Sequence, residues 1–283
     1  MIPAAFDYKA PTSVEEALAA LAEADDAKVI AGGQSLLPVL RMRLNAPEVL
    51  VDLGGIDSLR GIREDGDQIV VGAMTTYQAI LDDALVHEHL ALLGKATETV
   101  ADPQIRHRGT VGGALSHADP AGDLGATALA LDATMVITGS GGDRDVPASE
   151  FFTGLFETAV GDDELLTAIR FPKHTGWGAH YEKFVRVSHQ WSIVAVAATV
   201  RAEGGKIQEA KLGLTNMSDR PLRATGVEQA LVGAQASEDT VRGAAASAAD
   251  GTNPPSDLNG DADYRRSIVP VLTRRAVLAA AGA

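Results

Sequence analysis

Two diglycine segments, each beside a strand-like run, limit most strongly how this chain can fold. The first is Ala31-Gly32-Gly33-Gln34-Ser35, which follows directly on the short apolar run Lys28–Ala31. The second is Thr110-Val111-Gly112-Gly113-Ala114. Paired glycines let the main chain approach an anion closely, and successive N–H groups in such a turn form an anion-binding concavity. Two such turns on one surface would suit a diphosphate; two ordinary tight turns are the alternative.

Neither segment has the Gly-x-Gly-x-x-Gly spacing of nicotinamide-dinucleotide folds, which disfavours that class of site. The hydroxyls of Ser35 and Thr110 add hydrogen-bond donors to the two turns. Around the first turn, the pattern predicts a helix opened by Ser13, a strand, a short helix over 36–44 and a second strand over 49–53.

Hydrophobic periodicity predicts a longer mixed region after this first unit. We expect strands at 68–72, 134–138 and 165–171, and helices at 90–100 and 123–131. The pattern changes near Gly176-Trp177-Gly178, where we place the main domain boundary. Beyond it we expect a hairpin of strands 193–200 and 207–214, followed by helices at 225–232, 237–249 and 263–281. The predicted domains are 1–176, with subdomains of about 1–54 and 55–176, and 177–283.

Composition narrows the classes of function. With 283 residues, the chain is longer than one hydrophobic core usually accommodates, which indicates two or more domains. The net charge of −14 disfavours nucleic acid as a partner, because phosphate binding needs a basic face. The chain has no cysteine, so any iron–sulfur cluster that takes part must belong to another chain. No run approaches the roughly 20 apolar residues of a membrane span, and the N-terminus lacks a signal peptide. We expect a cytoplasmic protein.

The residues around both turns carry a resemblance to a known family. The run Val29-Ile30-Ala31-Gly32-Gly33-Gln34-Ser35-Leu36-Leu37-Pro38 resembles the first FAD-pyrophosphate loop of the medium subunits of molybdenum hydroxylases. Thr110–Ala114 resembles the second loop, and the match continues through Ser116-His117-Ala118-Asp119-Pro120-Ala121-Gly122-Asp123. The similarity extends over nearly the whole chain, and subunits of the aerobic carbon monoxide dehydrogenase type are the most similar.

The resemblance implies an α+β fold. A two-part FAD-binding domain of the vanillyl-alcohol-oxidase (PCMH) class would precede a small C-terminal domain built of an antiparallel sheet and helices. It implies FAD as the cofactor, with these contact residues: Ala31, Gly32, Gly33, Gln34, Ser35, Leu36, Thr110, Val111, Gly112, Gly113, Ala114, His117, Asp123, Leu166, Lys183 and Trp191. Gln34 stands where the family commonly has histidine, and Ala114 where asparagine is frequent.

Several of these residues also fit an ordinary structural role when the resemblance is set aside. Asp123 also suits a helix N-cap, Trp191 suits an apolar core, and Lys183 suits a solvated strand position. Arg106-His107-Arg108, just before the second turn, would either attract the FAD phosphates or contact a partner chain. His87 and His89 do not form a metal pair, because positions i and i+2 of a helix point apart.

The sequence shows no nucleophile, acid–base pair or metal site, so the chemistry would belong to the cofactor. The resemblance implies an electron-transfer subunit. It would accept electrons from [2Fe–2S] clusters of a small subunit, reduced by a large molybdenum-cofactor subunit, and deliver them to an external acceptor such as a quinone. The assembly would be a dimer of heterotrimers, associated with the inner membrane face through its acceptor. Three alternatives remain: a xanthine, nicotine or aldehyde-type medium subunit, a freestanding flavin oxidoreductase, and a scaffold without FAD.

Overall fold

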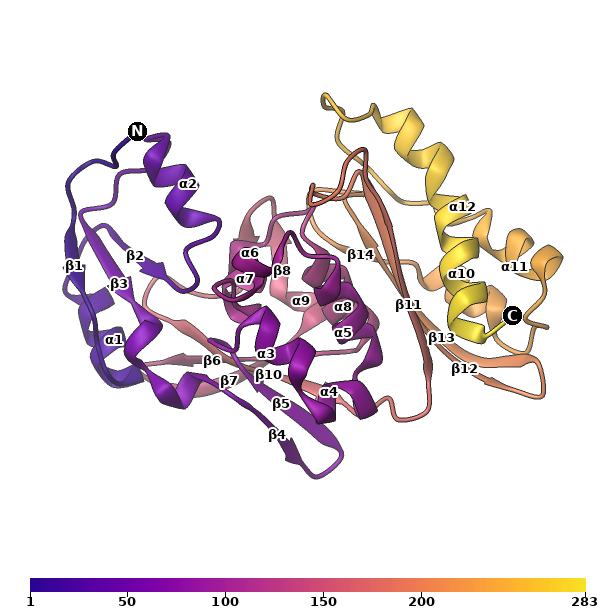
Figure 1. Cartoon of the computed structure of the whole chain (residues 1–283), viewed down its shortest axis with the longest axis horizontal. Helices are drawn as coiled ribbons and strands as arrows, with labels where there is room; N and C mark the ends of the chain where they lie inside the picture. The colour runs from indigo at the N-terminus through magenta and orange to yellow at the C-terminus, as the bar shows by residue number, and fades with distance from the viewer.

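The computed structural model describes residues 1–283, arranged along one long axis (Figure 1). The N-terminal lobe lies at one end, a five-stranded sheet with its helices lies in the middle, and a four-stranded sheet with a helical layer lies at the other end. None of the helices combines the length and apolar character that crossing a lipid bilayer requires.

The N-terminal lobe is a parallel three-stranded sheet of order β1-β3-β2. Its strands are β1 (Asp7–Lys9), β2 (Ala27–Ile30) and β3 (Val49–Asp52), and its helices are α1 (Val14–Ala22) and α2 (Leu36–Arg41). Ser13 caps α1 by accepting a 3.2 Å hydrogen bond from the Glu16 amide, as its spacing predicts. The 3-10 turns Leu53–Gly55 and Asp57–Leu59 lead out of the lobe.

The middle sheet is antiparallel throughout, in the order β4-β5-β10-β6-β7. Its strands are β4 (Ile62–Asp65), β5 (Gln68–Gly72), β6 (Thr134–Gly139), β7 (Gly142–Pro147) and β10 (Leu165–Pro172). The associated elements are α3 (Tyr77–Asp82), α4 (Ala84–His89), α5 (Ala91–Glu98), α6 (Pro103–Arg106), α7 (Val111–His117), α8 (Asp123–Ala130), α9 (Ala148–Phe151) and the small hairpin β8 (Phe152–Gly154) with β9 (Glu157–Thr158).

The C-terminal sheet is antiparallel, in the order β11-β12-β13-β14. Its strands are β11 (Gly178–Phe184), β12 (Val194–Glu203), β13 (Lys206–Thr215) and β14 (Leu222–Arg223). Helices α10 (Thr225–Leu231), α11 (Glu238–Ala245) and α12 (Ala262–Ala281) form the outer layer, while α5 and α8 contact the sheet from the middle region. Because β12 is covered on both faces, residues 194–200 are all buried, and all of them except Thr199 are apolar.

Helix α8 is tied to the C-terminal sheet. Gly213 of β13 lies directly on the Ala126 carbonyl of α8, where a Cβ would overlap that oxygen. Just past the helix end, the carboxylate of Asp132 pairs with Lys211 and with Arg223, which belong to β13 and β14. Helix α8 is therefore part of the middle region in sequence, but it packs against both the middle region and the C-terminal sheet.

The structure contains several elements that the sequence analysis did not predict, among them strands β1, β4 and β7. The predicted helix over 237–249 ends at Ala245. β4 forms a hairpin with β5 around Gly66, whose φ of +62° suits the Asp-Gly turn signal in the sequence. The chain leaves the helical path before Gly251, which has a φ of +71°.

Candidate functional site

The first diglycine segment offers a row of free main-chain donors. The amides of residues 32 to 36 donate no hydrogen bond within the protein, and the first amide to do so is Leu37, to the Gly33 carbonyl at 3.0 Å. Gly33 has a φ of +74°, which lets the chain turn into α2. The Ser35 hydroxyl makes no capping bond. Because unpaired donors at a helix start attract anions, this segment suits a phosphate group.

The second diglycine segment is not a turn, contrary to the sequence expectation. Thr110 is the N-cap of α7, and both glycines lie in the first turn of that helix. All four amides from Val111 to Ala114 already have acceptors: Thr75 O, Ala73 O, Thr110 Oγ1 and Thr110 O. The second segment therefore forms no nest of free amides. What it adds is the positive end of the α7 axis and, at the partly exposed Gly113, a position without a side chain.

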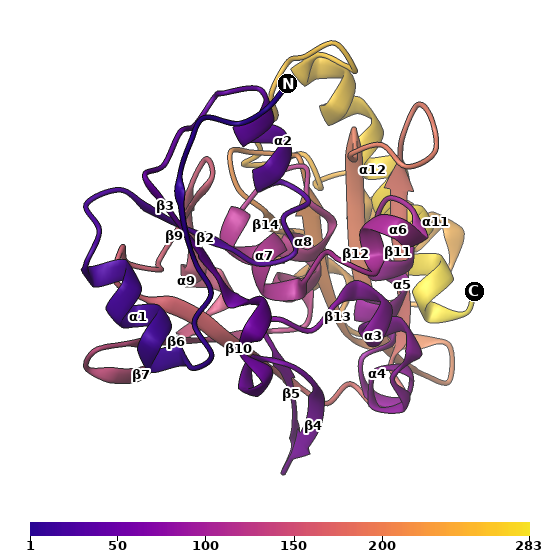
Figure 2. The ribbon, with the colours of Figure 1, turned by 60° about the vertical axis from the view of Figure 1, so that its left-hand side comes forward.

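The two segments lie against each other. A Cβ at Gly113 would come within 3.3 Å of the Ala31 Cβ, and a Cβ at Gly32 would overlap the Arg108 carbonyl oxygen. Figure 2 shows α7 between β2 of the N-terminal lobe and α8. The convergence of the two segments, inferred from sequence, is thus present in the fold, although only the first presents free amides. This arrangement fits a cofactor with an anionic diphosphate.

Asp123, the first residue of α8, is the centre of a buried polar cluster. Its carboxylate accepts hydrogen bonds from Tyr181 Oη at 2.8 Å and Ser192 Oγ at 2.9 Å, and pairs with Lys183 Nζ at 2.7 Å. Burial raises the pKa of the Asp123 carboxyl, and the Lys183 ammonium and the two hydroxyls oppose that rise. Two simpler readings are therefore wrong: Gly122 is the N-cap instead of Asp123, and Lys183 is buried instead of solvated.

The turn from Thr99 to Ala101 is a further part of this region, which the sequence did not reveal. Lys183 Nζ donates to Thr99 O at 3.1 Å, and Arg106 Nη1 donates to Val100 O at 3.0 Å and Ala101 O at 3.3 Å. His189 Nδ1 lies 2.7 Å from the same Ala101 oxygen. Ala101 has a φ of +41°. Arg106 therefore holds this turn in place, a role that the sequence analysis did not consider.

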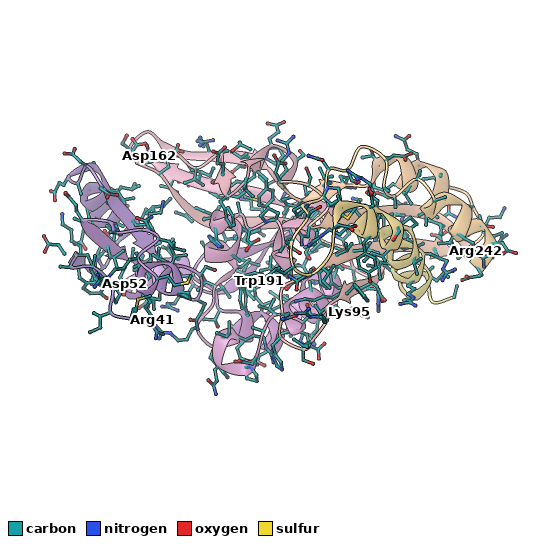
Figure 3. All side chains as sticks on the ribbon, turned by 90° about the horizontal axis from the view of Figure 1, so that it is seen from above. Arg41, Asp52, Lys95, Asp162, Trp191 and Arg242 are labelled. Carbon is teal, nitrogen blue, oxygen red and sulfur yellow. The ribbon has the colours of Figure 1, made fainter.

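The remaining candidate residues differ in how deeply they are buried. Leu166 is buried in β10, and His117 ends α7 with its ring 5.2 Å from that of Phe156. Trp191 is 58% exposed, so the core reading is wrong; Figure 3 places it near the middle of the long axis. The Gln34 side chain makes no hydrogen bond.

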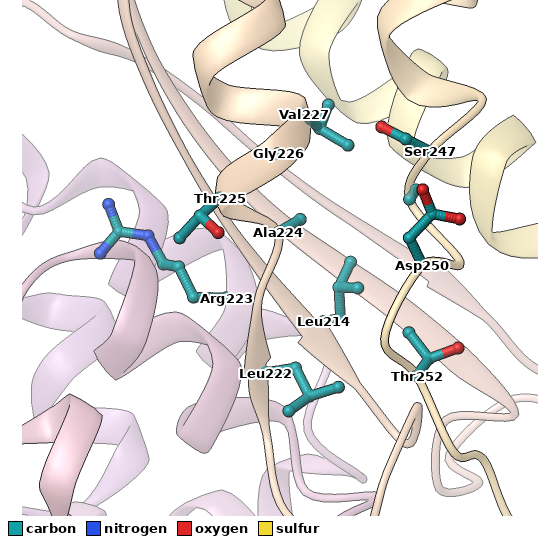
Figure 4. Close-up of a pocket in the computed structure, with 11 residues that line it drawn as sticks. Leu214, Leu222, Arg223, Ala224, Thr225, Gly226, Val227, Ser247, Asp250 and Thr252 are labelled. Atoms are coloured by element: carbon teal, nitrogen blue, oxygen red, sulfur yellow. The ribbon is translucent and has the colours of Figure 1, made fainter.

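Neither the histidine pair nor a small cavity in the C-terminal region forms an alternative functional site. His87 contacts the Leu81 carbonyl, whereas His89 contacts the Thr175 hydroxyl, so the rings diverge. A cavity of about 110 Å³ lies in the C-terminal region between β14, α10 and the chain after α11 (Figure 4). Its one cation, Arg223, is already paired with Asp132 and Glu228.

The family of the chain follows from comparison with known proteins. Residues 4–174 match the model of the FAD binding domain in molybdopterin dehydrogenase. Residues 179–280 match the CO dehydrogenase flavoprotein C-terminal domain. The chain belongs to the FAD-binding subunits of the molybdopterin dehydrogenases. The resemblance, the FAD cofactor and the α+β fold inferred from sequence are thereby confirmed.

Individual relatives match almost end to end. The carbon monoxide dehydrogenase medium chain of Hydrogenophaga pseudoflava is 39% identical, over 99% of this chain and 98% of its own length. The glyceraldehyde dehydrogenase medium chain of Sulfolobus acidocaldarius is 36% identical, over 98% of both. A solved structure of the Hydrogenophaga pseudoflava enzyme superposes with a TM-score of 0.96 at 41% identity, covering 99% of this chain and 98% of that one.

Sequence reasoning missed Tyr181 and Ser192, which complete the shell around Asp123. A signal existed for Tyr181, because residues i and i+2 of a strand share a face and Lys183 was already a candidate. No local pattern marks Ser192. Its position depends on Asn216, whose side-chain amide donates to the Ser192 carbonyl at 2.8 Å from a distant part of the chain.

Proposed function

We propose that this chain is the electron-transfer subunit of a molybdenum hydroxylase of the aerobic carbon monoxide dehydrogenase type. It would accept electrons from [2Fe–2S] clusters of a small subunit, fed by a large molybdenum-cofactor subunit, and pass them to an external acceptor such as a quinone. The observation that carries this proposal is the set of free amides at 32–36 packed against the start of α7, within a chain whose two family matches are both flavoprotein domains.

Within this proposal, a contiguous surface would hold the cofactor. The free amides and the Ser35 hydroxyl would bind the diphosphate, and the glycine surface of α7 would let it approach. The full set is Ala31, Gly32, Gly33, Gln34, Ser35, Leu36, Thr110, Val111, Gly112, Gly113, Ala114, His117, Asp123, Leu166, Lys183 and Trp191. Bound flavin supplies the redox chemistry, and the chain supplies position and electrostatics.

The side chains favour transfer of electrons over direct substrate chemistry. The chain has no cysteine, which assigns the clusters to a partner. The buried carboxylate of Asp123 has all its oxygens engaged by Tyr181, Ser192 and Lys183, so it is poorly placed to act as a general base. This observation disfavours a freestanding flavin oxidase.

We propose carbon monoxide as the substrate of the assembled enzyme, because carbon monoxide dehydrogenase medium chains are among the most similar relatives. The substrate would be selected in the large subunit. A xanthine, nicotine or aldehyde-type enzyme is the second candidate, and the similarity to a glyceraldehyde dehydrogenase medium chain supports it. We further propose a dimer of heterotrimers in the cytoplasm, associated with the membrane through its acceptor, and a domain boundary near residue 176.

The test is to purify the native complex and measure its flavin and its substrate range. We expect a visible flavin spectrum, co-purifying large and small subunits, and oxidation of carbon monoxide with an artificial acceptor. Purine, N-heterocycle and aldehyde substrates serve as the comparison. A complex that contains no flavin would refute the function. A flavin-containing complex that oxidises one of the comparison substrates and not carbon monoxide would refute the assignment of carbon monoxide as the substrate.

A further inference from the structure

Tyr77 lies where the chain enters the second diglycine segment. It is the first residue of α3, and its amide donates to the Gly109 carbonyl at 3.0 Å. The neighbouring Thr76 forms an isolated antiparallel bridge with Thr110, the N-cap of α7. The main chain of Tyr77 is therefore fixed relative to the start of α7.

The ring of Tyr77 is fixed as well, because it packs on Gly109. A Cβ at Gly109 would lie 2.6 Å from Tyr77 Cε2, so only glycine leaves room for the ring. The Cα of Gly109 is also the atom that a Cβ at Gly32 would approach to 2.8 Å. Gly109 thus contacts both the first diglycine segment and the Tyr77 ring, which places Tyr77 at the junction of the two segments.

The hydroxyl of Tyr77 has no partner in the protein. The residue is only 8% exposed, yet its oxygen makes no hydrogen bond within the protein. The oxygen is also not among the fully enclosed unpaired atoms, so it retains an opening. A phenol oxygen that reaches an opening in an otherwise packed site can donate to an acceptor from outside the protein, either water or a bound ligand.

The surroundings fix the role of the hydroxyl as a donor. Burial raises the pKa of Tyr77 above its ordinary value, and the charge of Asp123 contributes to the rise. The phenol therefore stays protonated at neutral pH, close to Asp123 but not bonded to it. Asp123 already accepts from Tyr181, Ser192 and Lys183, so the free O–H is available to another acceptor.

We infer that the Tyr77 hydroxyl donates a hydrogen bond to the bound FAD, which makes Tyr77 a further cofactor-contacting residue. The inference rests on the proposed cofactor site, because the junction at Gly109 is the place where both diglycine segments meet. FAD offers phosphate, hydroxyl and ring acceptors, and any of these would satisfy the donor.

The test removes the hydroxyl alone. Tyr77→Phe and the control Tyr264→Phe are made in the native complex, the flavin is removed, and FAD is titrated back while its fluorescence is followed. Tyr264 is 42% exposed in α12 and its hydroxyl likewise has no partner. We expect Tyr77→Phe to weaken FAD binding by roughly 3- to 10-fold, as the loss of one hydrogen bond would, and the control to match the wild type.

The thermal midpoint of the flavin-free complex separates a cofactor role from a structural one. Because the hydroxyl has no protein partner, the midpoint of Tyr77→Phe should not fall below that of the wild type. FAD affinity within about twofold of the wild type, or a lowered flavin-free midpoint, would overturn the inference. A wild-type complex that takes up no FAD would instead overturn the proposed site and this inference with it.

Discussion

The main chain of Gly32 lies directly on the carbonyl of Arg108, so closely that any side chain at position 32 would overlap that oxygen. This contact joins the segment after β2 of the N-terminal lobe to the segment that leads into α7. The glycine is needed there for the close approach of two backbones, whereas Gly33 is needed for its positive φ. Flavin binding should therefore depend on both glycines of the first segment.

Enlarging either packed glycine should release the cofactor. In Gly32→Val the side chain would collide with Arg108 O, and in Gly113→Val with Thr110 Oγ1 and Ala31. Overpacking costs about 1–3 kcal/mol, so flavin content should fall on the order of tenfold, while the C-terminal region stays folded. The measurement is flavin absorbance per purified chain. Gly141→Ala is the matched control, since its Cβ would meet no atom within 4 Å. Unchanged flavin in both valine variants would show that the segments do not hold the cofactor.

Removing the charge of Lys183 should destabilise the fold strongly. Lys183→Met leaves the buried Asp123 carboxylate without its cation, and breaking such a pair typically costs about 3–5 kcal/mol. The double variant Lys183→Met/Asp123→Asn should recover part of that loss, because no buried charge remains. Denaturant unfolding of the wild type, Lys183→Met, Asp123→Asn and the double variant forms a double-mutant cycle. Additive losses would mean that the two side chains do not interact energetically.

The stability of the fold should decrease in mild acid partly through His117. Burial lowers the pKa of His117 below 6.5 in the folded chain, the Asp119 charge opposes this shift and the Lys28 charge adds to it. As pH falls below 6.5 the unfolded chain binds a proton that the folded chain does not, so stability falls until the lowered folded pKa is reached. The slope is at most about 1.4 kcal/mol per pH unit. His117→Gln should flatten this part of the curve; an identical pH profile in the variant would contradict the assignment.

Removing the Arg106 side chain should lower the free energy of unfolding and loosen the turn from Thr99 to Ala101. Arg106→Ala leaves the carbonyls of Val100 and Ala101 without this donor, and the expected loss is about 1–3 kcal/mol of unfolding free energy. Amide exchange in residues 98–102 should accelerate. The neighbouring Arg108→Ala is the control, because the Arg108 side chain is exposed and makes no hydrogen bond. Equal losses in both variants would argue against a specific role for Arg106.

Local patterns predicted most of the fold and part of the site. The Ser13 cap, the strand 68–72 and the α8 start at Asp123 follow from spacing and periodicity, which act over a few residues. The helical form of Gly112 and Gly113 did not follow, because it depends on the distant acceptors Ala73 and Thr75. The same holds for the cluster around Asp123, whose partners come from β11 and from the turn before β12. Long-range contacts decide such features, and no short window of sequence contains them.

Helix α8 is fastened to the C-terminal sheet at both ends, through Asp123 at its start and Asp132 just beyond its end. Separating the two family regions into fragments would therefore leave Asp123 and Asp132 on one fragment and their cationic partners on the other. The two regions that the family models separate are therefore expected to depend on each other for stability.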